Sequence, residues 1–165
     1  MNTKEHRYSH ELVWTGNTGS GTSGYRAYER AHRIEIPGKQ AILGSSDPAF
    51  RGDPTRHNPE DLFVASISAC HLLWYLGLCA NRGVTVVTYE DSAEGFMLEE
   101  TSGAGRFTRV ILRPRVAVAA GTDLDLAERL HHEAHEKCFI ANSVNFEIFV
   151  TSETSIAEKV VSDAA

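Results

Sequence analysis

The sequence predicts an α+β fold, and three observations along the chain indicate it. Two segments, 58–82 and 123–138, carry helix signals, and the segments around them either alternate apolar with polar residues or are rich in β-branched residues. The resulting order is strands, helix, strands, helix and strand, with no internal repeat. With 165 residues, 42% hydrophobic and 23% charged, the chain is expected to form a single domain over 1–165.

Residues 1–57 are expected to form the N-terminal strands and their loops. Pro37-Gly38-Lys39 indicates a turn between two short extended stretches. Upstream, Gly19, Gly21 and Gly24 spell the G-x-G-x-x-G pattern of dinucleotide-binding loops. Because no βαβ unit follows this pattern, a hairpin arm is the better interpretation, and we expect no cofactor.

The segment 58–82 is expected to be the central helix. Asn58 is a good N-cap, Pro59 suits the first helical position, and acidic residues follow in the first turn. From Leu62 to Ala80 the segment has no Asp, Glu, Lys or Arg and approaches the length of a membrane span. Its internal polar residues and the charges just before it favour a buried helix outside any membrane. A helix apolar on every face requires wrapping sheets, a partner subunit or both.

The remaining elements are expected in the C-terminal half. Strands are predicted over 84–119, a second helix over 123–138 and a last strand over 145–153, all from their apolar periodicity. The strands over 84–119 are expected to be antiparallel with one face in water. The buried side of the second helix is expected to hold Leu126, Leu130 and Ala134.

Composition and charge exclude some functions and favour a cellular compartment. The net charge of −6 argues against nucleic-acid binding, which depends on clustered Lys and Arg. The polar N-terminus lacks the apolar stretch of a secretory signal, so a cytoplasmic location is expected. In a reducing cytosol the three cysteines do not form a structural disulfide framework, and a pair that does bond is catalytic or redox-sensing.

Cys70 has a position that limits how it can be activated. It lies 12 residues after the N-cap, about 18 Å along a continuous helix, whereas the helix dipole acts over the first turn only. On its own it is more typical of a structural core cysteine. A reactive thiolate there requires a cation from elsewhere, such as Arg51 or Arg30. Cys79 lies on the opposite helical face and is interpreted as a small buried hydrophobe.

A metal site is an alternative. His131, His135 and Cys138 lie at i, i+4 and i+7 of the second predicted helix and could supply three zinc ligands. Against this, His131 and His132 are neighbours on a polar, charged helix, where histidines are usually solvated.

Three motifs stand out along the chain, and they are Asn58-Pro59-Glu60-Asp61-Leu62, Ser68-Ala69-Cys70-His71 and Ala134-His135-Glu136-Lys137-Cys138. Together they resemble the signature of the OsmC/Ohr family of osmotically inducible and organic hydroperoxide resistance proteins. The resemblance spans about Arg30 to Val150, and the segments around Trp14, Cys70 and Cys138 suggest a less characterised OsmC-like branch.

The resemblance implies a peroxidase that acts in oxidative-stress defence. Cys70 would be the peroxidatic and Cys138 the resolving cysteine, reducing organic hydroperoxides, or also hydrogen peroxide, through a Cys70 sulfenic acid and a disulfide. A lipoyl-type or other dithiol would regenerate the pair. The family arginine corresponds to Arg51, with Arg30 in reserve, and Glu60 would orient it.

The resemblance also implies an intertwined homodimer, in which antiparallel sheets enclose central helices and the active sites lie at the interface. Glu60 and Cys70 are about 15 Å apart on an unbroken helix, too far for one guanidinium to bridge. Either the helix breaks between them or Glu60 approaches from the other subunit. An OsmC-like protein that binds a small ligand without peroxidase turnover is a further alternative.

Overall fold

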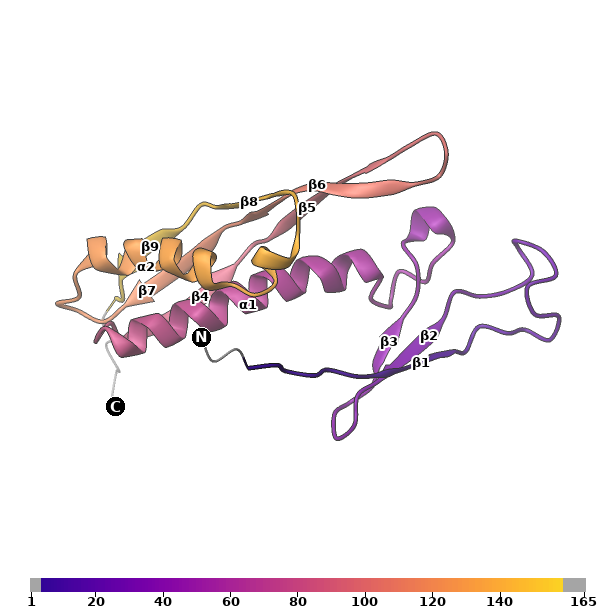
Figure 1. Ribbon diagram of the computed structural model, residues 1–165, viewed down its shortest axis with the longest axis horizontal. Coiled ribbons are helices and arrows are strands. Elements are labelled where there is room, and N and C mark those ends of the chain that lie inside the picture. The colour runs from indigo at the N-terminus through magenta and orange to yellow at the C-terminus, as the bar shows by residue number, and fades with distance from the viewer. Residues whose placement is uncertain (1–3, 159–165) are drawn as a thin grey trace, which may run out of the picture. The chain divides into compact units, whose positions relative to one another are not determined.

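The computed structural model describes residues 4–158, and the chain divides into two compact units between Leu62 and Phe63. Helix α1 (Pro59–Asn81) begins in the first unit and continues through the second (Figure 1). The side chain of Asn58 accepts a hydrogen bond from the Asp61 N–H at 2.7 Å, which confirms the predicted N-cap.

The N-terminal unit is a three-stranded antiparallel sheet with long connecting loops. Its strands are β1 (Glu11–Trp14), β2 (His32–Glu35) and β3 (Ile42–Gly44), in the order β1-β2-β3, followed by the short helix η1 (Pro48–Phe50). Leu12 pairs with Ile34, which in turn pairs with Ile42. Between residues 4 and 62 no apolar side chain is fully buried.

The C-terminal unit holds two further three-stranded sheets and a second long helix. The first sheet has the order β4-β7-β9 and the second the order β5-β6-β8. The elements are β4 (Val86–Asp91), β5 (Glu94–Glu99), β6 (Gly105–Leu112), β7 (Pro114–Val118), α2 (Leu124–Lys137), η2 (Ala141–Ser143), β8 (Glu147–Val150) and β9 (Glu153–Ile156).

The strands within 84–119 pair antiparallel as predicted, β4 with β7 and β5 with β6, but the predicted last strand is wrong. The segment expected as one strand over 145–153 forms two strands, β8 and β9, which join different sheets. Both pair in parallel, β8 with β6 and β9 with β7, so the sheets are not wholly antiparallel. Parallel neighbours need a long crossover connection, and α2 provides it.

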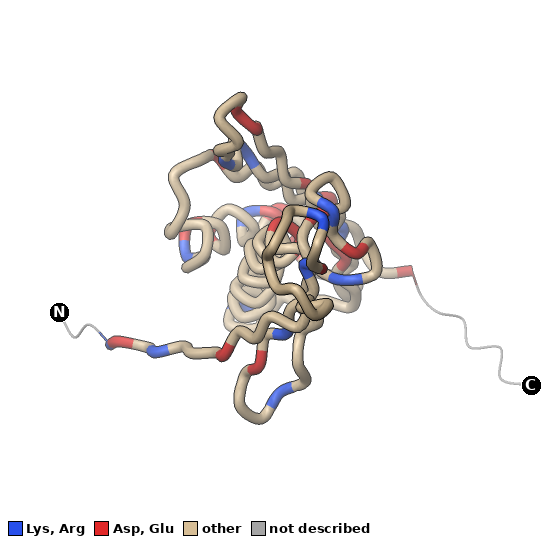
Figure 2. The backbone as a smooth tube through the Cα atoms, turned by 90° about the vertical axis from the view of Figure 1, so that its right-hand side faces the viewer, with Lys and Arg blue, Asp and Glu red and all other residues tan. Residues whose placement is uncertain are grey.

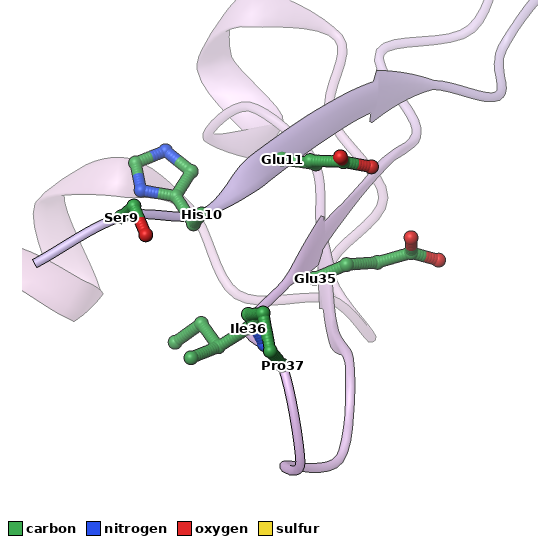
Figure 3. A pocket seen from close by; sticks show the side chains of 6 residues that line it. All are labelled: Ser9, His10, Glu11, Glu35, Ile36 and Pro37. Atoms are coloured by element: carbon green, nitrogen blue, oxygen red, sulfur yellow. The ribbon is translucent and has the colours of Figure 1, made fainter.

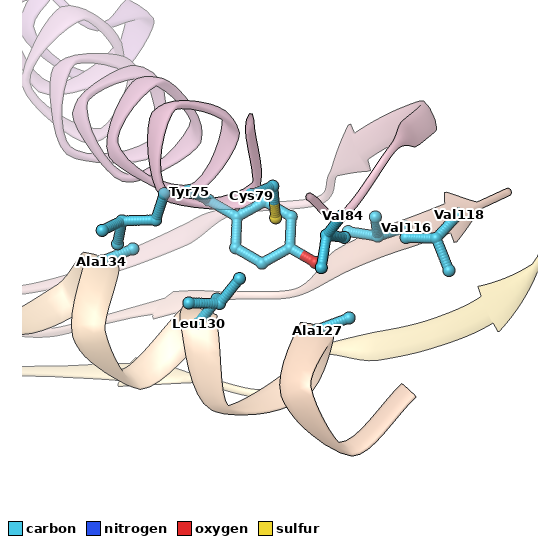
Figure 4. Packing of buried hydrophobic residues seen from close by; sticks show 9 residues of the cluster. Tyr75, Cys79, Val84, Val116, Val118, Ala127, Leu130 and Ala134 are labelled. Atoms are coloured by element: carbon cyan, nitrogen blue, oxygen red, sulfur yellow. The ribbon is translucent and has the colours of Figure 1, made fainter. Parts of the chain in front are cut away.

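The core of the C-terminal unit lies between the two helices and the strands. One cluster joins Tyr75 and Cys79 of α1 to Leu130 and Ala134 of α2 and to β7 (Figure 4). A second cluster centres on Ile67, Val110 and Leu112. Of the expected buried face of α2, Leu130 and Ala134 are fully buried and Leu126 is half-buried.

Helix α1 is buried on one face only. Ile67, His71 and Tyr75 face the core, whereas Leu73 is 68% exposed. By length and composition the helix could cross a membrane, and 28% of its most apolar stretch is buried. Such a helix is weak evidence for a membrane span, because core helices of soluble proteins share these features. Basic and acidic residues are interspersed along the chain, without a basic run (Figure 2).

Candidate functional site

Cys70 and Cys138, which are far apart in the sequence, lie side by side in the C-terminal unit. Cys70 is half-buried on α1, and Cys138 is buried directly after the last residue of α2. Both thiols are free, and the Cys70 thiol is close enough to that of Cys138 to raise its pKa. The structure therefore places the two thiols as neighbours.

The surroundings of Cys138 act in opposite directions on its thiol. Burial, with a contribution from the Cys70 thiol, raises the pKa of Cys138 to about 11. The N–H groups of Ala141 and Ile140 lower it, and the Ala141 N–H lies 3.4 Å from the sulfur. The Cys138 thiolate is thus disfavoured by burial and favoured by the backbone.

Further contacts fix α1 against its neighbours on both sides of Cys70. The Ser68 hydroxyl donates to Asp91 at 2.5 Å, and Asp91 also accepts the Arg113 N–H at 2.7 Å. Trp74 packs edge-to-face on Phe139, with ring centroids 5.5 Å apart. This aromatic contact ties the residue after Cys138 to the helix of Cys70.

Cys79 is separate from this pair, as the sequence indicates. It is buried in the core beside Tyr75 (Figure 4), and burial raises the pKa of its thiol. Its interpretation as a small buried hydrophobe is confirmed.

His71 and His131 form a buried pair between α1 and α2. The Nε2 atom of His71 lies 3.1 Å from Nδ1 of His131, and the rings are nearly parallel at 6°. Burial lowers the pKa of each imidazole to about 4, helped by the neighbouring histidines. Both rings are therefore neutral at pH 7, one donating and the other accepting.

The expectation that His131 is solvated is wrong. It follows Leu130 and lies one turn after Ala127 and before Ala134, so it belongs to the buried stripe of α2. That spacing is visible in the sequence and was the signal to use. The proposed zinc ligands His131, His135 and Cys138 are not brought together: over residues 4–158, no three or more His, Cys, Asp or Glu side chains are grouped to hold a metal ion.

The other predicted site residues belong to the N-terminal unit. Glu60 is half-buried in the first turn of α1, and this helix is continuous to Asn81, so a break between Glu60 and Cys70 is excluded. Arg51 is exposed and has a left-handed backbone, with φ of 66°, at the end of η1.

Arg30 is held far more firmly than Arg51. Its guanidinium donates to the carbonyl oxygens of Tyr28 at 2.7 Å and Tyr25 at 2.8 Å. It also lies over both tyrosine rings, 4.2 and 4.4 Å from their centroids. Arg30 therefore has a fixed geometry, whereas no side-chain partner of Arg51 occurs in the described part of the chain.

Two surface hollows are lined by residues other than the three cysteines. In the N-terminal unit a pocket of about 420 Å³ is lined by Glu11 and Glu35, which extend to the same side, and by none of the predicted site residues (Figure 3). In the C-terminal unit an open groove of about 640 Å³ is lined by Phe63, Phe107 and Phe146 and by the segment that follows Cys138.

Comparison with known proteins adds to this geometry. A family model described as OsmC-like protein matches residues 52–153. The chain is similar to an OsmC-like protein of unknown function from Vibrio cholerae, with 34% identity and a TM-score of 0.80 over 90% of this chain and 100% of that one. No curated protein matches.

Two more distant structures share the fold. An organic hydroperoxide resistance protein from Elizabethkingia anophelis has 18% identity and a TM-score of 0.65 over 93% of this chain and 100% of its own. The organic hydroperoxide resistance protein of Bacillus subtilis has 20% identity and a TM-score of 0.58 over 89% of this chain and 98% of its own.

Proposed function

The chain belongs to the OsmC-like protein family, and from this premise we propose that it is a thiol peroxidase that reduces organic hydroperoxides in oxidative-stress defence. The observation that carries the proposal is that Cys70 on α1 and Cys138, which directly follows α2, are close enough for the Cys70 thiol to raise the pKa of Cys138. Structural relatives described as organic hydroperoxide resistance proteins support it.

In the proposed reaction Cys70 is the peroxidatic cysteine. Its thiolate attacks the distal oxygen of the hydroperoxide, the O–O bond breaks, and the departing alkoxide takes a proton to become an alcohol. The Cys138 thiolate then attacks the Cys70 sulfenic acid, and hydroxide leaves and is protonated to water. The disulfide that results is reduced by two electrons from an external dithiol.

The groove lined by Phe63, Phe107 and Phe146 supports an organic substrate. The three rings contact one another, with centroids 5.0 to 6.1 Å apart. The groove also borders the segment that follows Cys138. An apolar organic group can bury surface there, whereas hydrogen peroxide has none to bury.

The proposal includes a homodimer. Helix α1 has an exposed face, and the N-terminal sheet has no fully buried apolar side chain. We propose that a second copy of the chain packs on both surfaces and buries them. Because α1 is continuous, Glu60 would then reach Cys70 from the other subunit. Sedimentation velocity tests this: a species of one chain at micromolar concentration would contradict the dimer.

The arginine that stabilises the Cys70 thiolate is tested by comparing Arg51 with Arg30. Arg51 is the first choice from the family resemblance, but the Arg30 guanidinium is already fixed by its bonds to the carbonyl oxygens of Tyr28 and Tyr25, so less ordering is needed for it to act. The variants R51K and R30K keep the charge and lose the planar fork. The arginine whose variant lowers kcat/KM for hydroperoxide is the one that stabilises the Cys70 thiolate. If both variants have an equal, small effect on kcat/KM, neither arginine has this role.

The decisive experiment measures hydroperoxide consumption by Cys70→Ser, Cys138→Ser and, as matched control, Cys79→Ser. Cumene hydroperoxide is compared with hydrogen peroxide, and dithiothreitol with dihydrolipoamide. We expect no turnover by Cys70→Ser, no intramolecular disulfide in Cys138→Ser and unchanged turnover by Cys79→Ser. Wild-type turnover by Cys70→Ser would refute the mechanism, and absence of turnover by the wild type in every combination would favour a ligand-binding role.

A further inference from the structure

The backbone after Cys138 folds back toward its sulfur atom. Cys138 leaves the helical conformation, with φ of −65° and ψ of 113°, and η2 begins three residues later. This turn directs the N–H of Ala141 at the sulfur, 3.4 Å away, and the N–H of Ile140 also acts on it. One backbone donor therefore points at the buried sulfur, and a second lies close enough to lower its pKa.

Asn142 holds this turn in place. Its side-chain amide donates to the carbonyl oxygens of Glu136 at 2.9 Å and Cys138 at 3.0 Å. Its backbone N–H donates to the Cys138 carbonyl as well, at 3.0 Å. Asn142 is exposed, so its contribution is these bonds rather than packing.

The bonds have a local structural role and a consequence for the sulfur. The last carbonyls of a helix have no partner within the helix, and an amide that bonds two carbonyl oxygens at the end of α2 satisfies them. In doing so, it fixes the segment 138–142 as a closed loop. The N–H groups of Ile140 and Ala141 lie inside that loop, so their direction depends on the bonds of Asn142.

We propose that Asn142 is a positioning residue for Cys138, because it holds the Ile140 and Ala141 N–H groups toward the sulfur that becomes a thiolate. This inference rests on the proposed function, in which the Cys138 thiolate attacks the Cys70 sulfenic acid. The S–O bond breaks as the S–S bond forms, and hydroxide leaves with a proton as water. Preoriented backbone donors stabilise the attacking charge without reorganisation.

Burial makes such donors necessary. The Cys138 sulfur is almost wholly screened from water, which disfavours its charged form. Its titratable neighbour is the Cys70 thiol on α1, which carries no positive charge, and Lys137 beside it pairs with Glu133. The backbone N–H groups are the groups at the sulfur that favour a thiolate.

The test uses a background of Cys70→Ser and Cys79→Ser, in which Cys138 is the one remaining thiol. The rate of alkylation by iodoacetamide is measured from pH 7 to 12, with and without Asn142→Ala. Asn145→Ala is the matched control, because Asn145 is an exposed asparagine in the same segment. Thermal unfolding of each variant is recorded alongside.

We expect Asn142→Ala to move the alkylation midpoint to higher pH and to slow alkylation below that midpoint by roughly two- to tenfold, the equivalent of one lost hydrogen bond. Asn145→Ala should leave the profile unchanged. A merely structural role predicts the opposite, because a loosened turn exposes the sulfur and speeds alkylation. A midpoint that stays in place or falls overturns the proposal.

A second measurement separates this inference from the proposed function. In the chain with all three cysteines, one equivalent of cumene hydroperoxide is added, and disulfide formation is followed by mass spectrometry. Asn142→Ala should slow it by a similar factor. If the wild type forms no disulfide but the alkylation midpoint still shifts, the peroxidase proposal fails and the role of Asn142 stands. If the wild type forms the disulfide and the midpoint does not shift, only the role of Asn142 fails.

Discussion

Ile67, in the C-terminal unit, is completely buried, whereas Leu12, in the first strand of the N-terminal unit, keeps 62% of its surface exposed. The difference extends to the units as a whole. The C-terminal unit has two clusters of buried apolar side chains. The N-terminal unit relies on polar contacts. Examples are the Trp14 indole N–H, which donates to the Glu29 carbonyl at 2.9 Å, and the Arg30 guanidinium, which donates to the carbonyl oxygens of Tyr28 and Tyr25.

This difference shows which unit can be stable without help. A hydrogen bond contributes about 1 kcal/mol net, and a small sheet with no buried face cannot offset the entropy of ordering its chain. The cysteine pair lies in the unit that has its own core. The candidate arginines lie in the N-terminal unit, which has no buried apolar core of its own. The proposed reaction therefore requires both units, whereas the cysteine pair requires only the C-terminal unit.

The largest expected effect is in the core. Ile67→Ala removes three methyl-sized groups from a fully buried site and should lower the free energy of unfolding by about 2–5 kcal/mol. Because Ile67 is buried within one copy, the loss should be the same at low and high protein concentration. Urea unfolding followed by tryptophan fluorescence measures it. A loss that depends on protein concentration would contradict the claim that this unit is complete by itself.

Acid should weaken the C-terminal unit through the buried pair His71 and His131. The unfolded imidazoles bind protons below about pH 6.5, whereas the folded ones, with pKa about 4, do not until lower pH. Stability is therefore fully present above pH 6.5 and falls as the pH drops to 4. At about 1.4 kcal/mol per pKa unit, protonation of the first of the two imidazoles should lower the free energy of unfolding by on the order of 3 kcal/mol.

The groups that face this pair from neighbouring elements modify that loss. Asp91 on β4 and Glu128 on α2 favour protonation, and His135 on α2 opposes it. NMR titration of the two buried imidazoles gives the direct test. Titration of either buried imidazole near pH 6.5 would contradict the prediction.

Local signals in the sequence predicted the helices, and the reason is that each cap lies within a few residues of what it caps. Asn58 caps α1, and Asp123 accepts the Leu126 N–H at 3.1 Å at the start of α2. Strand pairing depends on distant partners, so the parallel β8 and β9 were not predictable from their alternation. The break at Thr151 and Ser152 that separates them lacks the Gly or Pro that usually marks one.

Some residues of the candidate site could likewise be predicted from the sequence, and others could not. Family resemblance named Cys70 and Cys138, and their contact depends on how α1 and α2 pack. The amphipathic spacing of α2 could have placed His131 inside, had the position been judged by its helical neighbours rather than by its polarity. Asn142 carries no signal in the sequence, because its bonds depend on the turn after Cys138.

A smaller effect is expected in the N-terminal unit. Leu12→Ala should cost about 1 kcal/mol or less in a single copy, since Leu12 buries little surface there. If a second copy covers the N-terminal sheet, the variant should also dissociate at a higher protein concentration than the wild type. Sedimentation equilibrium measures this, with Ile67→Ala as the comparison. A cost for Leu12→Ala equal to that of Ile67→Ala on dilution to a single chain would remove the contrast between the units.

The smallest expected effect tests an assumption of the comparison between the two units. The assumption is that exposed polar contacts contribute little to the free energy of unfolding. Arg115 on β7 and Glu90 on β4 form an ion pair at 2.9 Å with side chains 60% and 71% exposed. Such pairs contribute about 0–1 kcal/mol and less in salt, so Arg115→Ala should change the free energy of unfolding by about 0.5 kcal/mol or less. Arg33 and Glu35 in the N-terminal sheet form a second exposed pair, with side chains 42% and 41% exposed, and Arg33→Ala should also have a small effect on the free energy of unfolding. A cost well above 1 kcal/mol at either site would mean that polar contacts can hold a sheet here without a core, and the need for a second copy to cover the N-terminal unit would disappear.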